Sequence, residues 1–220
     1  AIRFTVLQAA LSALLSTVLA IPVARALARR RFVGRGLLVT LLGAPFILPV
    51  IVAVLGVLAV FGRAGWLNTA LSAVGLPGIT IYGLHGVVLA HVFFNLPLAT
   101  RLLLQAWQTV PAERFRLAAQ LGLTPRAVFH SIELPLLRQI LPGTPALIFV
   151  ICLTSFAVAL TLGGGPRATT IELAIYQAFR FDFDLNRAAL LSLVQLGLAG
   201  STAALALWII PAISLGGGQD

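Results

Sequence analysis

Polar side chains that could take part in chemistry are few in this sequence, and they lie inside long apolar stretches. His91 and Asn95 are four residues apart, so they share one face of a helix, directly before Pro97. Strongly polar groups within such stretches tend to face a bundle interior or a water-filled path. The other candidates for a translocation pathway are Thr154, Ser155 and Gln195. The alternative for His91 and Asn95 is a structural role, in which they bond a neighbouring helix or carbonyls freed by Pro97.

Catalytic and cofactor-binding patterns are missing from the sequence. His91 could act as a base, but no nucleophile motif accompanies it. A phosphate-binding loop needs a lysine, and the chain has none, so we interpret Gly163–Gly165 as a flexible turn. Cys152 lies within an apolar run and is expected to pack there. We therefore expect no catalytic residue, no metal site and no cofactor bound by this chain.

Composition indicates a membrane protein. Of 220 residues, 60% are hydrophobic and 10% charged, whereas a soluble domain has about 25% charged residues. The mean hydropathy is +1.04. The net charge of +9 comes from arginines that lie between apolar runs, a pattern of membrane topology rather than of nucleic-acid binding. The chain contains no methionine, so we expect a segment or a processed product of a longer protein.

Five stretches are long enough to cross about 30 Å of hydrocarbon as helices. They lie at about 4–24, 37–61, 82–104, 143–163 and 188–212. We expect a single all-α transmembrane domain, a polytopic bundle over residues 1–220, with kinks at Pro22, Pro45, Pro49 and Pro97.

The arginines predict the orientation of the spans. The loop after the first span carries Arg25, Arg29, Arg30, Arg31 and Arg35 without an acidic residue, so it is predicted to be cytoplasmic. The loop at about 108–138 is cytoplasmic by the same rule, and the other two loops are outside. In the second outer loop, Thr169 and Glu172 form a capping box that predicts a short surface helix through about Phe179.

The cytoplasmic loop is predicted to hold two short helices. The first begins near Pro111 and ends at Gly122; Thr124 then caps a second helix, which Pro125 starts and Pro135 ends. We call residues 111–134 the helix–glycine–helix module.

This module resembles the loop shared by permease subunits of bacterial ABC importers. The family pattern is Glu-Ala-Ala, three residues, Gly, nine residues, Ile-x-Leu-Pro, and the chain matches it from Gly122 onward. Upstream, Arg116 stands where the family has Glu, so a role of that Glu does not carry over. The resemblance implies the type I importer permease fold and a loop that couples to a separate ATP-hydrolysing subunit. The residues that would couple are Ala118, Ala119, Gly122, Ile132, Leu134 and Pro135.

Three further stretches narrow the resemblance to permeases of thiamine ABC importers. They are residues 47–50, 89–105 and 162–178. The resemblance implies a transport subunit rather than an enzyme, one that moves thiamine or its phosphates across the inner membrane. It implies as partners an ABC ATPase dimer that uses the ATP, a periplasmic substrate-binding protein and a second permease half in the same polypeptide. In the outer loop, Glu172 and Tyr176 are candidates for contact with the binding protein, or have a structural role.

Two alternatives remain. Iron(III) permeases share weaker forms of the same motifs, so the solute could be iron(III) or another small solute. A secondary transporter or channel is the more distant alternative, because no Asp or Glu lies inside a predicted span.

Overall fold

The computed structural model describes residues 1–165 and 168–209, and their secondary structure is entirely helical. The three longest helices are α1 (Ile2–Arg29), α6 (Leu84–Thr109) and α13 (Leu185–Ile209), and the shorter α10 (Gly143–Leu153) packs among them. Between α1 and α6 lie α2 (Arg35–Leu41), α3 (Ala44–Ile47), α4 (Val50–Phe61) and α5 (Trp66–Ala73). The remaining helices are α7 (Ala112–Gln120), α8 (Pro125–Val128), the π-helical turn η1 (Phe129–Glu133), α9 (Leu134–Ile140), α11 (Phe156–Leu162) and α12 (Ile171–Arg180).

Five helical stretches are long and apolar enough to cross a membrane. They are Ile2–Arg29, Val50–Ala73, Leu84–Thr109, Pro125–Leu153 and Leu185–Ala206. The protein is therefore an all-α, multi-pass membrane protein, as the composition predicts. The first, third and fifth stretches coincide with predicted spans. The predicted end of the fifth span at 212 lies outside the described residues.

The predicted span 37–61 is not one helix. It is divided into α2, α3 and α4, with breaks at Gly43 and at Leu48–Pro49. Proline has no N–H and its ring clashes with the preceding turn, so Pro49 can begin α4 but not continue α3. The two other prolines within long helices, Pro22 in α1 and Pro97 in α6, are accommodated without ending them.

The predicted span 143–163 is also divided. Here α10 ends at Leu153 and α11 begins at Phe156, and α10 is continuous with the helical segments that start at Pro125. No proline causes this break. Side chains from other helices bond the carbonyls that it frees.

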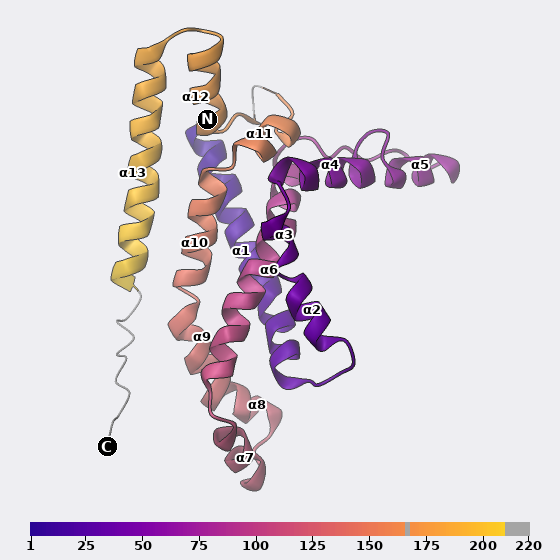
Figure 1. The fold of residues 1–220 in the computed structure, drawn as a ribbon, viewed down its shortest axis with the longest axis vertical. Helices are drawn as coiled ribbons and strands as arrows, with labels where there is room; N and C mark the ends of the chain where they lie inside the picture. Colours follow the sequence, from indigo (N-terminus) through magenta and orange to yellow (C-terminus); the bar gives the residue numbers. More distant parts are fainter. Residues whose placement is uncertain (166–167, 210–220) are drawn as a thin grey trace.

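Small residues allow α1 to pack closely against its neighbours. Ala9, Ala13, Ala20 and Ala24 are buried, and they pack in one cluster with α6 residues such as Leu103 and α10 residues such as Ile148. Close approach through small residues is the usual basis of helix packing in membranes, where lipid competes for apolar contacts. One core cluster thus lies where α1, α6 and α10 meet (Figure 1), and a second lies between α4, α6 and α11.

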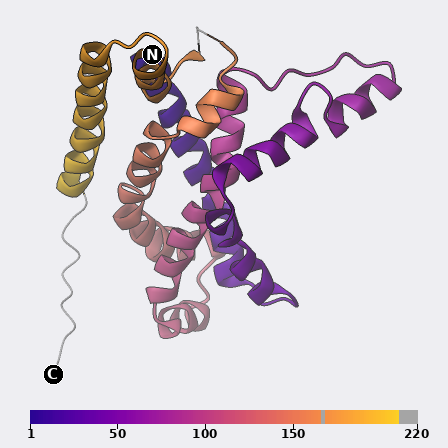
Figure 2. The same cartoon turned by 45° about the horizontal axis from the view of Figure 1, so that its top comes forward.

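The connecting segments gather at two opposite ends of the structure. The end of α1 lies near α7 and α8 at the bottom of Figure 1, whereas the start of α1 lies near α12 at the top. The Ile171 N–H donates to Thr5 Oγ1 at the upper end (2.9 Å), and Arg25 pairs with Glu133 at the lower end. The α4–α5 arm extends from the upper end (Figures 1 and 2). This arrangement agrees with the alternation of loops that the arginines predict.

Candidate functional site

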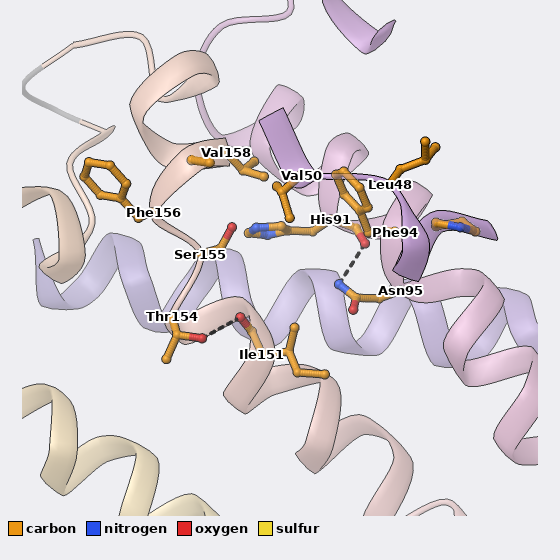
Figure 3. Close-up of a pocket in the computed structure, with 12 residues that line it drawn as sticks. Leu48, Val50, His91, Phe94, Asn95, Ile151, Thr154, Ser155, Phe156 and Val158 are labelled. Atoms are coloured by element: carbon orange, nitrogen blue, oxygen red, sulfur yellow. Dashed lines mark hydrogen bonds between the residues drawn. The ribbon is translucent and has the colours of Figure 1, made fainter. Parts of the chain in front are cut away.

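A cavity of about 490 Å³ lies where α6, the start of α4 and the α10–α11 break come together (Figure 3). Its lining is mostly apolar, with a few polar groups. The lining residues are Pro45, Leu48, Val50, His91, Phe94, Asn95, Ile151, Thr154, Ser155, Phe156, Ala157 and Val158. Four of the five predicted pathway residues are therefore brought together here. A concave, mostly apolar site with a few placed polar groups is typical of small-molecule binding.

His91 and Asn95 are held by hydrogen bonds on the cavity wall. Both are only 3% exposed. Ser12 Oγ lies 3.3 Å from His91 Nδ1, and the Asn95 side-chain amide donates to the His91 carbonyl at 2.9 Å and to Cys152 Sγ at 3.4 Å. His91 Nε2 has no hydrogen-bond partner among the described residues. The ring is thus oriented from one side, and its other nitrogen is buried without a partner in the described part of the chain.

The break between α10 and α11 frees carbonyls that side chains from three elements satisfy. Gln8 of α1 donates to the Cys152 carbonyl at 3.0 Å, and Gln195 of α13 donates to the Leu153 carbonyl at 3.0 Å. Thr154 bonds the Ile151 carbonyl through its own hydroxyl (Figure 3). Non-helical backbone at membrane depth requires such partners, because lipid supplies none. Hydrogen bonds from surrounding side chains therefore stabilise the helix break in the cavity wall.

Gln195 does not line the cavity, unlike the other predicted pathway residues. Its amide also donates to Glu172 Oε1 of α12, at 2.6 Å. Glu172 is half-buried, and this burial raises the pKa of its carboxyl group above the ordinary value. Gln195 thus connects helix α12 with the helix break.

Tyr176 belongs to an aromatic cluster at the same end as α12. Its ring lies 5.1 Å from the ring of Phe156 and 5.8 Å from that of Phe181, measured between centroids. Because Phe156 lines the cavity, this cluster lies directly beside it. The predicted helix in this segment is α12, but its N-cap is Thr170, which accepts from the Leu173 N–H, and not Thr169. Both threonines precede the helix, so the sequence alone could not separate them.

The helix–glycine–helix module ends its first helix in a Schellman motif. Gly122 has φ +62°, the Gly122 N–H donates to the Ala119 carbonyl, and the Leu123 N–H donates to the Ala118 carbonyl. Thr124 caps α8 by accepting from the Ala127 N–H at 3.3 Å. The predicted turn at Gly122 and the predicted cap are thus both present.

The six predicted coupling residues differ in exposure. Ala118 is buried, Ile132 and Leu134 are half-buried, and the exposed ones are Ala119, Gly122 and Pro135. Leu117 on α7 and Leu121, which caps the end of α7, are also exposed, at 56% and 75%. The module therefore presents apolar side chains at the lower end of the molecule.

Pro135 does not end the second helix, contrary to the sequence prediction. Helical structure continues through η1 into α9, which runs to Ile140. Within η1 the backbone hydrogen bonds span five residues instead of four, as in the bond that the Leu134 N–H donates to the Phe129 carbonyl. This π-helical turn lets the chain pass a residue that has no N–H, so the helix survives the proline.

Two polar residues of α1 were missed by the sequence analysis. Gln8 and Ser12 are fully buried and bond the Cys152 carbonyl and His91, and Thr5 and Ser16 of the same helix are also buried. The sequence did hold a signal, because these four residues recur at helical spacing and share one face of α1. Elsewhere, residues 1–165 and 168–209 contain no group of three His, Cys, Asp or Glu that could hold a metal ion.

The chain is similar to proteins named as thiamine transport system permeases. It is 56% identical to the one from Escherichia coli strain K12 over 196 residues, which are 89% of this chain and 37% of that protein. It is 52% identical to the one from Brucella abortus strain 2308 over 198 residues, 89% of this chain and 36% of that protein. The chain thus spans somewhat over a third of the length of these curated relatives. No protein-family model matches it.

The fold is also found in a solved ABC transporter. A chain of a bacterial alginate ABC transporter, in complex with an alginate pentasaccharide-bound periplasmic protein, matches with a TM-score of 0.71. The match covers 95% of this chain and 75% of that chain, at 19% sequence identity. The helical arrangement is therefore that of an ABC importer permease.

Proposed function

We propose that this chain is the first permease half of an ATP-driven importer, and that it moves thiamine or its phosphates across the inner membrane. The observation that carries the proposal is the identity of more than 50% to thiamine transport permeases over 89% of the chain. The ABC-importer fold supports the same conclusion. Transport, rather than catalysis, is the role of this polypeptide.

The helix–glycine–helix module is the proposed docking site for an ATPase dimer in the cytoplasm. Its exposed leucines, Leu117 and Leu121, offer an apolar surface, and the turn at Gly122 presents backbone without a side chain. ATP is bound and hydrolysed by that partner. A docked partner can drive a transport cycle only when it favours different arrangements of the permease at different stages.

The cavity at the α10–α11 break is the proposed site where the solute binds during transport. Its mostly apolar lining, with a few polar residues such as Asn95, Thr154 and Ser155, suits an aromatic ring that carries a few hydrogen-bonding groups. A periplasmic binding protein delivers the solute to the outer end, where Tyr176 is exposed. Glu172 is the weaker candidate for that contact, because its carboxylate already accepts from Gln195. The second permease half completes the pathway.

Uptake of labelled thiamine tests the proposal. The full-length permease, its ATPase and its binding protein are placed in vesicles, and uptake is measured with and without ATP. We expect accumulation that requires ATP and the binding protein, and that excess unlabelled thiamine abolishes while iron(III) does not. Accumulation that iron(III) abolishes instead, or that proceeds without ATP, would overturn the assignment.

A further inference from the structure

Glu133 is a buried acidic residue that the proposed function does not use. It lies in η1, its side chain is 0% exposed, and the Arg25 Nε–H donates to its Oε2 at 2.5 Å. Arg29 Nε lies 3.7 Å from the other oxygen. Burying a carboxylate is costly unless cations compensate it, so these two arginines of α1 hold Glu133 in place.

Each arginine also contacts an aromatic ring of the module. The guanidinium of Arg25 lies over Phe129, 5.4 Å from the ring centroid, and that of Arg29 lies over Phe115 at 4.5 Å. Phe115 belongs to α7 and Phe129 to η1, on the two sides of the Gly122 turn. Such contacts are attractive at these distances. The last turns of α1 therefore bind both arms of the helix–glycine–helix module.

The same helix reaches the cavity at its other half. Gln8 bonds the Cys152 carbonyl, and Ser12 contacts the ring of His91. Ser12 and Arg25 are about 20 Å apart along the helix, at 1.5 Å per residue. Helix α1 continues without interruption between them, through Pro22. It is thus a single element with one end on the module and the other on the cavity wall.

We propose that Arg25, Glu133 and Arg29 form a joint that makes α1 move together with the module. The inference rests on the proposed function and adds a path by which movement of the module reaches the cavity. Movement of the module by the ATPase displaces α1, and α1 displaces the groups that hold His91 and the α10–α11 break. Glu133 is a positioning residue in this scheme, since it contacts neither solute nor ATP.

Glu133→Gln in the full-length permease tests the joint. The substitution keeps the size of the side chain and removes the charge that attracts both arginines. With the ATPase and binding protein in vesicles, we expect thiamine imported per ATP hydrolysed to fall at least about fivefold, within the range found for residues that carry coupling. The variant should still co-purify with the ATPase and hydrolyse ATP. Asp182→Asn is the matched control, because it removes the charge of an exposed acid that pairs with Arg187 outside the module, and it should behave as the wild type.

The possible outcomes distinguish failure of the proposed joint from failure of the proposed transport function. A Glu133→Gln complex with wild-type import per ATP overturns the joint and leaves the transporter assignment intact. A wild-type complex without ATP-dependent thiamine uptake overturns the assignment, and the inference with it. If Glu133→Gln fails to assemble, Arg29→Gln decides, because it keeps the Arg25–Glu133 bond. It should lower import per ATP relative to Arg30→Gln, an exposed neighbour, and equal values for the two would refute the joint.

Discussion

Single buried polar side chains define the cavity of this permease fold. His91 and Asn95 could be predicted as a pair, since their spacing and their position inside an apolar stretch are readable in the sequence. Their surroundings could not. Ser12 approaches His91 from 79 positions away in the chain, and a serine in an apolar helix looks the same whether it faces lipid or a histidine. The predicted structural and pathway roles of His91 are compatible, because one ring nitrogen contacts Ser12 while the residue also lines the cavity.

Gln8→Leu tests whether the hydrogen bond from Gln8 of α1 to the Cys152 carbonyl stabilises the helix break. The change leaves the Cys152 carbonyl without its donor in a fully buried position. An unsatisfied buried group costs about 1–3 kcal/mol, so the melting temperature of the purified protein should fall by several degrees. Gln105→Leu, at an exposed position of α6, is the control and should leave it unchanged. Equal melting temperatures for the two variants would show that the bond does not support the break.

Hydropathy locates helices but not their interruptions. The break at Thr154–Ser155 has no proline and no charge, so nothing in the apolar run 143–163 indicates it. Gln8 and Gln195 bond the freed carbonyls from other helices, so these partners are tertiary, and only the Thr154 bond to the Ile151 carbonyl is local. In contrast, the turn at Gly122 and the cap at Thr124 are local, and both were predictable. Pro135 misled the prediction because a preceding π-helical turn absorbs its missing N–H.

Pro135→Ala tests the role of that π-helical turn. Alanine restores an N–H and is far better tolerated than proline within a helix, so the melting temperature should stay the same or rise. The regained α-helical bonding changes the face of the helix on which Glu133 lies, because the wider turn is no longer needed. Import per ATP should therefore decrease. Pro125→Ala, at the first position of α8 where proline is well tolerated, is the control.

The opposite result is easily recognised. A Pro135→Ala protein with wild-type import per ATP would show that the direction of Glu133 does not depend on the π-helical turn.

At the scale of the whole molecule, α1 connects three functional regions. Thr5 binds the start of α12 at the upper end of Figure 1, Gln8 and Ser12 bond the break and His91, and Arg25 binds the module. The arginine distribution predicted that the loops alternate between two ends, and the structure has this alternation. The sequence analysis used Arg25 only as evidence for the orientation of the spans. Its ion pair with Glu133 depends on the packing of elements 108 residues apart, which no local pattern reveals.

Site-specific photo-crosslinking in intact cells tests the central claim most directly, that the helix–glycine–helix module is cytoplasmic and docks on an ATPase. A photoreactive residue at Leu121, which is 75% exposed on the module, is compared with one at Trp66, which is 77% exposed at the opposite end. We predict that the Leu121 position crosslinks to the ATPase subunit and the Trp66 position does not. A crosslink from the Leu121 position to a periplasmic protein, with the ATPase captured from Trp66 or from neither position, would contradict this account.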